Sequence, residues 1–174
     1  IILSALAFPA TAATIIRMGA IPVFADCDVR SLNMNSKDVS SKITSNTKAI
    51  IASHTFGNPS GIESIACIAQ EQEISLIEDA HQAIGSKINT RQVGSFGRAA
   101  VFGFHSTAQL TSVEGGVITT DDDALAKQCQ ERRNHGFSSD PALGVQEVHQ
   151  IRTGERMISM GYDYKLSEVH AAVG

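Results

Sequence analysis

The sequence lacks most of the features that mark specialised classes of protein. Its 174 residues include no tryptophan, four prolines and three cysteines, and charged residues make up only 18% of them. A hydrophobic share of 43% is that of a folded globular chain of about one domain and excludes intrinsic disorder. The net charge of −4 provides no basic excess, so we expect no binding to nucleic acid or to a membrane surface.

The cysteines and the apolar runs exclude further classes. Cys27, Cys67 and Cys129 are odd in number, lie far apart and form no CxxC motif, which excludes a disulfide framework or a structural zinc site. We expect them to be small buried residues of a protein from a reducing compartment, the cytoplasm. No apolar run is long enough to span a bilayer, and Ile1–Ala7 has no basic region before it, unlike a signal peptide.

Three common ligand-binding and catalytic motifs are also absent. The chain has no GxGxxG after a strand and no GxxxxGK[ST], so neither kind of nucleotide-binding loop is present. The segment 94–97 is a turn and not a phosphate loop. No GxSxG occurs, which argues against an α/β-hydrolase with a Ser-His-Asp triad.

Strand-like and helix-like segments alternate along the chain, which predicts an α/β fold with a mainly parallel (mixed) sheet flanked by helices. The expected strands are 1–7, 21–24, 48–53, 74–77, 99–104 and 116–120. The expected helices are 9–18, 36–43, 62–69 and 121–133, with Ser36 as a helix cap and a polar loop at 136–154. We predict one α/β domain.

Both ends of the sequence fall inside such patterns. The chain begins without methionine in an apolar, strand-like run, and it stops within the amphipathic, helix-like pattern of 168–174. We therefore expect it to be an internal part of a longer protein.

Polar residues follow three of the expected strands, at the end of the sheet where open α/β folds bind ligands. These segments are 78–82, 105–110 and 54–57. Ordinary structural roles explain each one alone: Asp79 can cap a turn, Gln82 can satisfy backbone groups, and His54 and His81 can be simple hydrogen-bonded histidines. A metal site at Glu78, Asp79 and His81 is a weak alternative, because alternation along a strand splits these side chains between two faces.

Several segments in order resemble one family, the DegT/DnrJ/EryC1/StrS sugar aminotransferases, which depend on pyridoxal 5′-phosphate (PLP). The matching segments are 8–11, 19–26, 54–59, 76–83, 93–97, 102–116, 133–136 and 161–168. The resemblance implies fold type I of the aminotransferases. It implies that 1–174 is part of the large PLP-binding domain, without the N-terminal phosphate-loop segment and the C-terminal small domain.

The resemblance also implies a reaction and its partners. The expected activity is transfer of an amino group from an amino acid, such as glutamate, to a nucleotide-linked keto-sugar. Such reactions serve the synthesis of amino sugars for polysaccharides, including lipopolysaccharide, or for antibiotics. The cofactor would be PLP or pyridoxamine 5′-phosphate (PMP), and the active site would be shared within a homodimer.

The resemblance assigns roles in cofactor binding to five residues. Asp79 matches the carboxylate that keeps the pyridine nitrogen protonated, and Gln82 matches the residue near the phenolic oxygen of the ring. Phe8 matches the aromatic side chain that stacks on the ring. Gly103 stands where the family often has a phosphate-binding serine, which would leave that role to the backbone. Asp163 stands where relatives have an asparagine that reaches the partner's cofactor phosphate.

One departure from the family pattern concerns the central catalytic position. The family has its Schiff-base lysine where this chain has Ala108, and a methyl group can neither form an imine nor carry a proton. Lys87 and Lys127 lie in other elements and are no obvious substitutes. Three explanations of Ala108 stay open. They are a deliberate Lys→Ala substitution that traps a bound ligand, an error in the sequence, and a natural variant. The alternative functions are a catalytically silent binding or regulatory homologue and a lysine-less, PMP-dependent sugar dehydratase.

Overall fold

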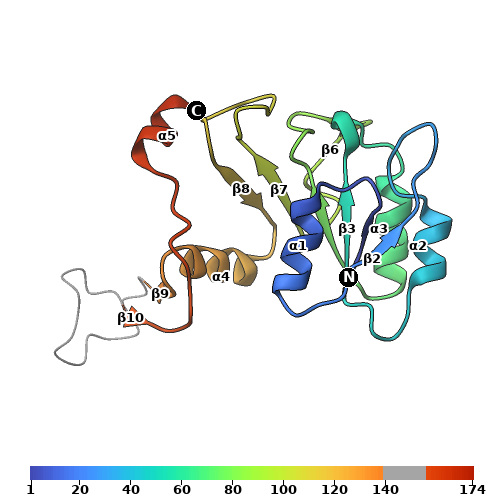
Figure 1. Cartoon of the computed structure of the whole chain (residues 1–174), viewed down its shortest axis with the longest axis horizontal. Helices are drawn as coiled ribbons and strands as arrows, with labels where there is room; N and C mark the ends of the chain where they lie inside the picture. Colours follow the sequence, from blue (N-terminus) through green and yellow to red (C-terminus); the bar gives the residue numbers. More distant parts are fainter. Residues whose placement is uncertain (139–155) are drawn as a thin grey trace. The chain divides into compact units, whose positions relative to one another are not determined.

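The computed structural model of the chain describes residues 1–138 and 156–174. They belong to two compact units (Figure 1). Unit 1 comprises Ile1–Asp121 and Val169–Gly174, and unit 2 comprises Asp122–Glu168. The assignment of 1–174 to part of a PLP-binding large domain stays a prediction.

A six-stranded sheet forms the centre of unit 1, with the strand order β2-β1-β3-β4-β7-β8. Its strands are β1 (Ile2–Ser4), β2 (Val23–Ala25), β3 (Ala49–Ser53), β4 (Ser75–Asp79), β7 (Ala99–Gly103) and β8 (Gly116–Thr119). Neighbouring strands are parallel throughout except for β8, which pairs antiparallel with β7. The predicted fold class, a mainly parallel mixed sheet flanked by helices, is confirmed.

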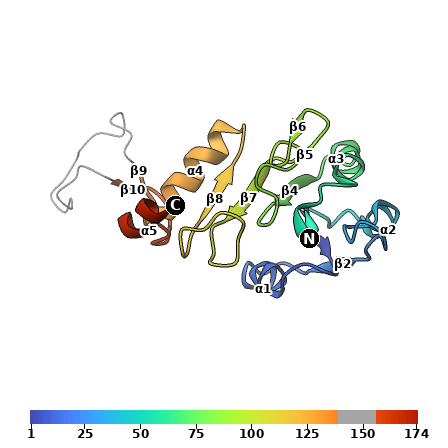
Figure 2. The same cartoon turned by 90° about the horizontal axis from the view of Figure 1, so that it is seen from above.

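Helices cover the two faces of this sheet unequally. One face carries α1 and the other carries α2 and α3 (Figure 2). Their bounds are Pro9–Arg17 for α1, Ser36–Lys42 for α2 and Ile62–Glu71 for α3. A 3-10 turn at Thr55–Gly57 follows β3, and a short hairpin of β5 (Lys87–Ile88) and β6 (Arg91–Gln92) follows β4.

The main core lies between the sheet and the helices α2 and α3. Register places Ile2, Ile50 and Leu76 side by side on one face, because Ile50 pairs with both neighbours. All three are buried, and Val39 of α2 and Ile65 of α3 belong to the same apolar cluster. Burial of this apolar face stabilises the sheet by about 25 cal/mol for each Å² removed from water.

Unit 2 contains four short or medium elements in its described residues. They are α4 (Asp123–Arg133), β9 (Phe137–Ser138), β10 (Arg156–Met157), which pairs antiparallel with β9, and the start of α5 (Glu168–Val173). The side chain of Asp122 caps α4 by accepting a hydrogen bond from the Leu125 N–H at 3.0 Å. Most of the expected loop at 136–154 lies outside the described residues.

Several expectations about local structure are wrong. The expected strand 1–7 is reduced to β1, and β4 extends further than expected, to include Glu78 and Asp79. The expectation that all cysteines are buried fails at Cys67, whose exposed thiol donates to Glu71 Oε1 at 3.3 Å. None of the described helices is both long and apolar enough to cross a membrane.

The cap of α2 is Asn35 and not Ser36 as expected. The Asn35 side-chain oxygen accepts from the backbone N–H of Lys37 at 3.0 Å. Asn35 has an extended backbone, while Ser36 already belongs to the helix. From the N-cap position, which Asn35 occupies, a side-chain oxygen can reach the free N–H groups of the first helical turn.

We predict that Asn35→Ala lowers the free energy of unfolding by about 1 kcal/mol, because the first turn of α2 loses its cap. The matched control Ser36→Ala should change it by less than about 0.5 kcal/mol. Urea-induced unfolding of both variants measures the difference. A larger loss for Ser36→Ala than for Asn35→Ala would contradict this assignment of the cap.

Candidate functional site

The candidate site lies at the carboxyl edge of the sheet in unit 1. Because β1, β3, β4 and β7 are parallel, their carboxyl ends lie at one edge, where open α/β sheets bind ligands. The predicted residues Phe8, Asp79, Gln82, Gly103 and Ala108 all lie at the ends of these strands or in the segments that follow them. The topology therefore brings five of the six predicted positions to the same edge.

The two faces of this edge differ in chemistry. Asp79 is paired in register with Ser53 of β3 and Val101 of β7, so these side chains share one face. Gly103 follows Val101 by two positions and faces the same way. Glu78 faces the opposite side of the sheet, towards the buried core, where its side chain is fully inaccessible. The carboxylates of the adjacent residues Glu78 and Asp79 therefore lie on opposite faces of the sheet, the first fully buried and the second partly exposed.

Asp79 is half-buried and only weakly held by its neighbours. Its Oδ2 accepts from the Ser53 hydroxyl at 3.3 Å, and its Oδ1 accepts from the His81 backbone N–H at 3.4 Å. Both distances are long for hydrogen bonds to a carboxylate. Asp79 can therefore accept a stronger hydrogen bond from a ligand.

Glu78, in contrast, is fully engaged by protein groups. Its Oε2 accepts from His54 Nε2 at 2.9 Å and from the Gly94 N–H at 2.9 Å. Its Oε1 accepts from the N–H groups of Phe96 at 2.6 Å and Gly97 at 2.9 Å. Because an ionised carboxylate only accepts hydrogen bonds, the proton of this contact lies on His54 Nε2. This network ties β3, β4 and the turn after β6 together.

The pKa of Glu78 reflects these contacts. Burial alone would raise it, but the hydrogen bonds from His54 and from the N–H groups of Gly94, Gly97 and Phe96 outweigh burial and hold the pKa below its usual value. Glu78 is therefore ionised in the folded protein at neutral pH. The buried charge is matched by four donors, as such a charge requires.

Gln82 is exposed and has one half of its amide free. Its Oε1 accepts from the backbone N–H of Phe56 at 2.9 Å, which fixes the orientation of the amide. The amide nitrogen forms no hydrogen bond to the described part of the chain, so its N–H groups can donate to a ligand. The neighbouring Gly57 has a φ of +79°, and a Cβ there would lie 2.7 Å from the Gln82 carbonyl oxygen. The turn therefore needs glycine at this position.

Phe8 and Ala108 mark opposite flanks of the edge. Phe8 is the N-cap residue of α1, and its ring is 74% exposed, so a flat ligand can reach it. Ala108 lies in the turn after β7, where its N–H donates to the His105 carbonyl at 2.8 Å. Its side chain provides no nucleophile and no titratable group.

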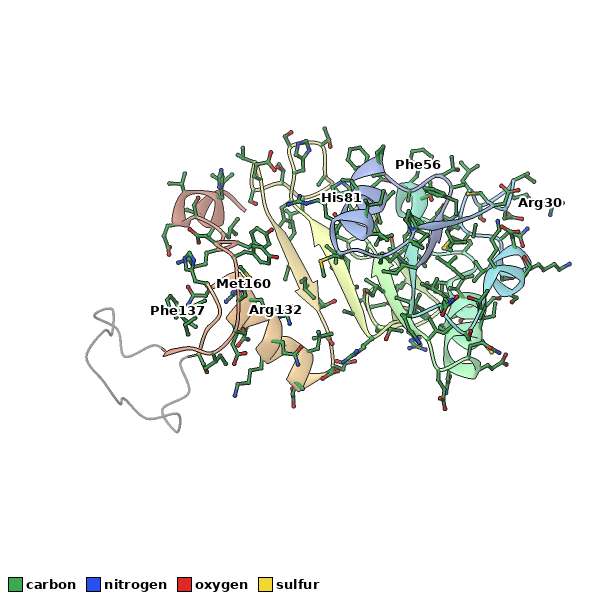
Figure 3. All side chains as sticks on the ribbon, turned by 60° about the horizontal axis from the view of Figure 1, so that its bottom comes forward. Arg30, Phe56, His81, Arg132, Phe137 and Met160 are labelled. Carbon is green, nitrogen blue, oxygen red and sulfur yellow. The ribbon has the colours of Figure 1, made fainter. Side chains whose placement is uncertain are left out.

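His81 is a residue of this edge that the sequence analysis considered as an ordinary hydrogen-bonded histidine or, weakly, as a metal ligand with Glu78 and Asp79. Its imidazole lies directly over Gly103, in the space that a side chain at position 103 would occupy: a Cβ there would be 2.8 Å from His81 Cε1 and closer still to Nδ1. Figure 3 shows His81 towards the same end of the sheet as Phe56. In the sequence, the contact between His81 and Gly103 leaves no recognisable pattern. It becomes visible only once the pairing of β4 with β7 is known.

Asp163, the sixth predicted position, lies in unit 2. It is exposed, forms an isolated bridge with Asn134, and its Oδ1 lies 3.7 Å from both His135 Nε2 and Lys165 Nζ. The Lys165 ammonium can offset its charge. Its predicted role at a partner's cofactor phosphate stays a prediction, as do the roles of the other five positions.

Solved structures of other proteins share this fold over 99% of the chain. The aminotransferase PseC of Helicobacter pylori, which takes part in pseudoaminic acid biosynthesis, is 27% identical with a TM-score of 0.86, and 44% of it is covered. DesI, solved with its TDP-sugar product, is 32% identical with a TM-score of 0.83 and 41% covered. A variant of GDP-4-keto-6-deoxymannose-3-dehydratase with bound GDP-perosamine is 26% identical, with a TM-score of 0.87 and 46% covered.

These neighbours place the fold in the class of the PLP-dependent aminotransferases. The chain belongs to the DegT/DnrJ/EryC1/StrS aminotransferase family, whose family model matches residues 1–174. It is 40% identical over 174 residues to the "Pleiotropic regulatory protein" of Geobacillus stearothermophilus, covering 99% of this chain and 43% of that one. It is 32% identical over 174 residues to the GDP-perosamine synthase of Vibrio cholerae, covering 100% and 44%. The chain thus spans less than half the length of these relatives.

We predict that Glu78→Gln lowers the free energy of unfolding by about 1–3 kcal/mol at pH 7, because the two donors that face the new amide NH2 group lose their acceptor. The pKa of Glu78 is lower in the folded than in the unfolded protein. The stability that its ionised form contributes is therefore complete above the unfolded pKa of about 4.5 and is lost as the pH falls through the folded pKa. The difference in the free energy of unfolding between wild type and Glu78→Gln should therefore become smaller below about pH 4.5. Urea unfolding across pH 3–7 measures it.

The exposed Glu63 provides a matched control for this experiment. Glu63→Gln should change stability by less than about 0.5 kcal/mol at any of these pH values. A difference between wild type and Glu78→Gln that stays constant or grows on acidification would contradict the network.

Proposed function

We propose that the chain is part of the cofactor-binding region of an aminotransferase that transfers an amino group from an amino acid, such as glutamate, to a nucleotide-linked keto-sugar. Membership of the family and likeness to PseC and DesI support this proposal. The observation that carries it is the weakly held Asp79 carboxylate at the carboxyl edge, followed in the next segment by Gln82, whose amide oxygen is held by the Phe56 N–H. We place the protein in the cytoplasm, as a homodimer with a shared site.

The residues at this edge fit a phosphorylated pyridine cofactor, PLP or PMP, that is held without a covalent bond. When bound, such a cofactor supplies an electron sink for reactions at the carbon next to an amino group. Asp79 would hold a proton on the pyridine nitrogen, and the Gln82 amide would donate to the phenolic oxygen. Phe8 would limit the tilt of the ring.

Ala108 limits what this form of the protein can do. Covalent attachment of the cofactor and proton transfer both need a basic side chain at this position, and a methyl group supplies neither. We therefore propose that the chain as written binds its cofactor but does not complete amino transfer.

We predict that Ala108→Lys, made in the complete gene product that carries this sequence, attaches PLP covalently. A new absorbance band should appear on addition of PLP, and borohydride reduction should fix the cofactor's mass on residue 108. The wild type with Ala108 should show neither. Mass spectrometry of the digested protein locates the modified residue.

A second variant tests whether the attached cofactor uses the proposed site. Asp79→Asn combined with Ala108→Lys should weaken PLP binding by about tenfold or more, because the charged partner of the ring nitrogen is lost. Absence of the band in Ala108→Lys, with the protein folded, would count against the proposed function.

A second candidate function is a catalytically silent, regulatory homologue. Ala108 favours it, as does the name of the Geobacillus stearothermophilus relative, "Pleiotropic regulatory protein", which is 40% identical to this chain. The codon for residue 108 in the natural gene discriminates between the aminotransferase and the silent homologue. An alanine codon supports the silent homologue, and a lysine codon excludes it.

A lysine-less, PMP-dependent sugar dehydratase is a further alternative, and the likeness to GDP-4-keto-6-deoxymannose-3-dehydratase supports it. Incubation with PMP and a nucleotide-linked 4-keto-sugar tests it. A 3-deoxy product in the mass spectrum would favour this reaction over amino transfer.

A further inference from the structure

The carboxyl edge of the sheet contains no lysine or arginine in the segments that follow its parallel strands β1, β3, β4 and β7. These segments are 5–8, 54–61, 80–86 and 104–115. The side chains there that can carry positive charge are three histidines, His54, His81 and His105. An anionic group bound beyond these four strands therefore depends on a histidine or on backbone N–H groups. The fifth parallel strand, β2, lies at the outer edge of the sheet, and Arg30 belongs to the segment that follows it.

Two of these histidines already have partners. His54 is buried, and its Nε2 donates to Glu78. His105 has Thr107 Oγ1 at 3.1 Å from its Nδ1 and Glu114 Oε1 at 3.6 Å from its Nε2. The ring of His81, by contrast, has no hydrogen-bond partner or ion pair within residues 1–138 and 156–174. It is half-buried, which makes an unpaired imidazole at this position costly unless a ligand or water satisfies it.

The position of His81 is fixed by the absence of a side chain on β7. Its imidazole fills the space over Gly103, on the same face of the sheet as Asp79. Its backbone N–H also donates to Asp79 Oδ1. A ligand that reaches Asp79 from this face therefore meets the imidazole next to it.

We propose that His81 binds the phosphate group of the ligand at this site, through a hydrogen bond from an imidazole N–H to a phosphate oxygen. This inference rests on the proposed function, which supplies a ligand with a phosphate. The phosphate can belong to the cofactor or to the nucleotide of the sugar substrate, because both present the same anionic oxygens. His81 and Gly103 act as a pair, since any side chain at position 103 displaces the imidazole from this place.

Paired ligands with and without a phosphate test this contact directly. PMP and pyridoxamine differ only in the phosphate, and a nucleoside diphosphate provides the second source of the group. Binding of each to the complete gene product can be measured by calorimetry, in wild type and in His81→Ala. No step of catalysis is needed, so the presence of Ala108 does not interfere.

We expect His81→Ala to weaken PMP binding by about tenfold or more, which is the effect of losing one charge-assisted hydrogen bond, and to leave pyridoxamine binding unchanged. If the nucleoside diphosphate and not PMP loses affinity, the phosphate is that of the substrate. The imidazole Cε1–H signal of His81 should also shift in NMR spectra on addition of the ligand that depends on it.

Substitution of Gly103 provides an independent variant that keeps the histidine. Gly103→Ala places a methyl group against the imidazole, which can rotate away without unfolding the chain. It should weaken binding of the same ligand as much as His81→Ala does. The double variant should bind this ligand with the same affinity as either single variant, because both substitutions remove the same contact.

Two failures can be told apart. If the wild type binds neither PMP nor the nucleoside diphosphate, the proposed function fails, and this inference fails with it. If the wild type binds either of them but His81→Ala binds both as tightly as wild type, only the role of His81 is overturned. Equal weakening of PMP and pyridoxamine in His81→Ala would also overturn it, because the contact would not involve the phosphate.

Discussion

The arrangement of the candidate site depends on one buried carboxylate, that of Glu78. Four hydrogen bonds, from His54 and from three backbone N–H groups, allow it to remain charged in the core. These contacts fix the end of β4 against β3 and against the turn at Gly94–Gly97. Asp79 is the next residue, so the same contacts determine where its carboxylate emerges on the opposite face. A strong structural charge on one face thereby positions a weakly held charge on the other.

The polarity of the sheet then determines which groups meet a ligand. Five parallel strands deliver their ends to one edge. The segments that follow β1, β3, β4 and β7 contribute a carboxylate, an amide, an exposed aromatic ring and an imidazole, but no lysine or arginine. Ala108 belongs to the same edge, and its methyl group offers no side-chain amine for covalent attachment of a ligand.

The alternation of apolar and polar segments was enough to predict the α/β fold and most strand positions, because the core strands are continuous apolar runs. The family resemblance identified Asp79, Gln82 and Ala108, which the topology brings to one edge. A hydrogen-bonded role for His54 was expected, but its partner could not be predicted, because Glu78 is 24 residues away and only strand pairing brings the two together. His81 was missed for the same reason: its contact with Gly103 depends on the register of β4 and β7.

The central claim is that Asp79 binds the nitrogen of a phosphorylated pyridine ring. A crystal structure of the complete gene product with PMP tests it most directly. We predict a separation of about 2.7–2.9 Å between an Asp79 oxygen and the ring nitrogen, with the ring against Phe8. PMP bound elsewhere, or an Asp79 carboxylate turned into a separate ion pair with no ligand beside it, would contradict the account.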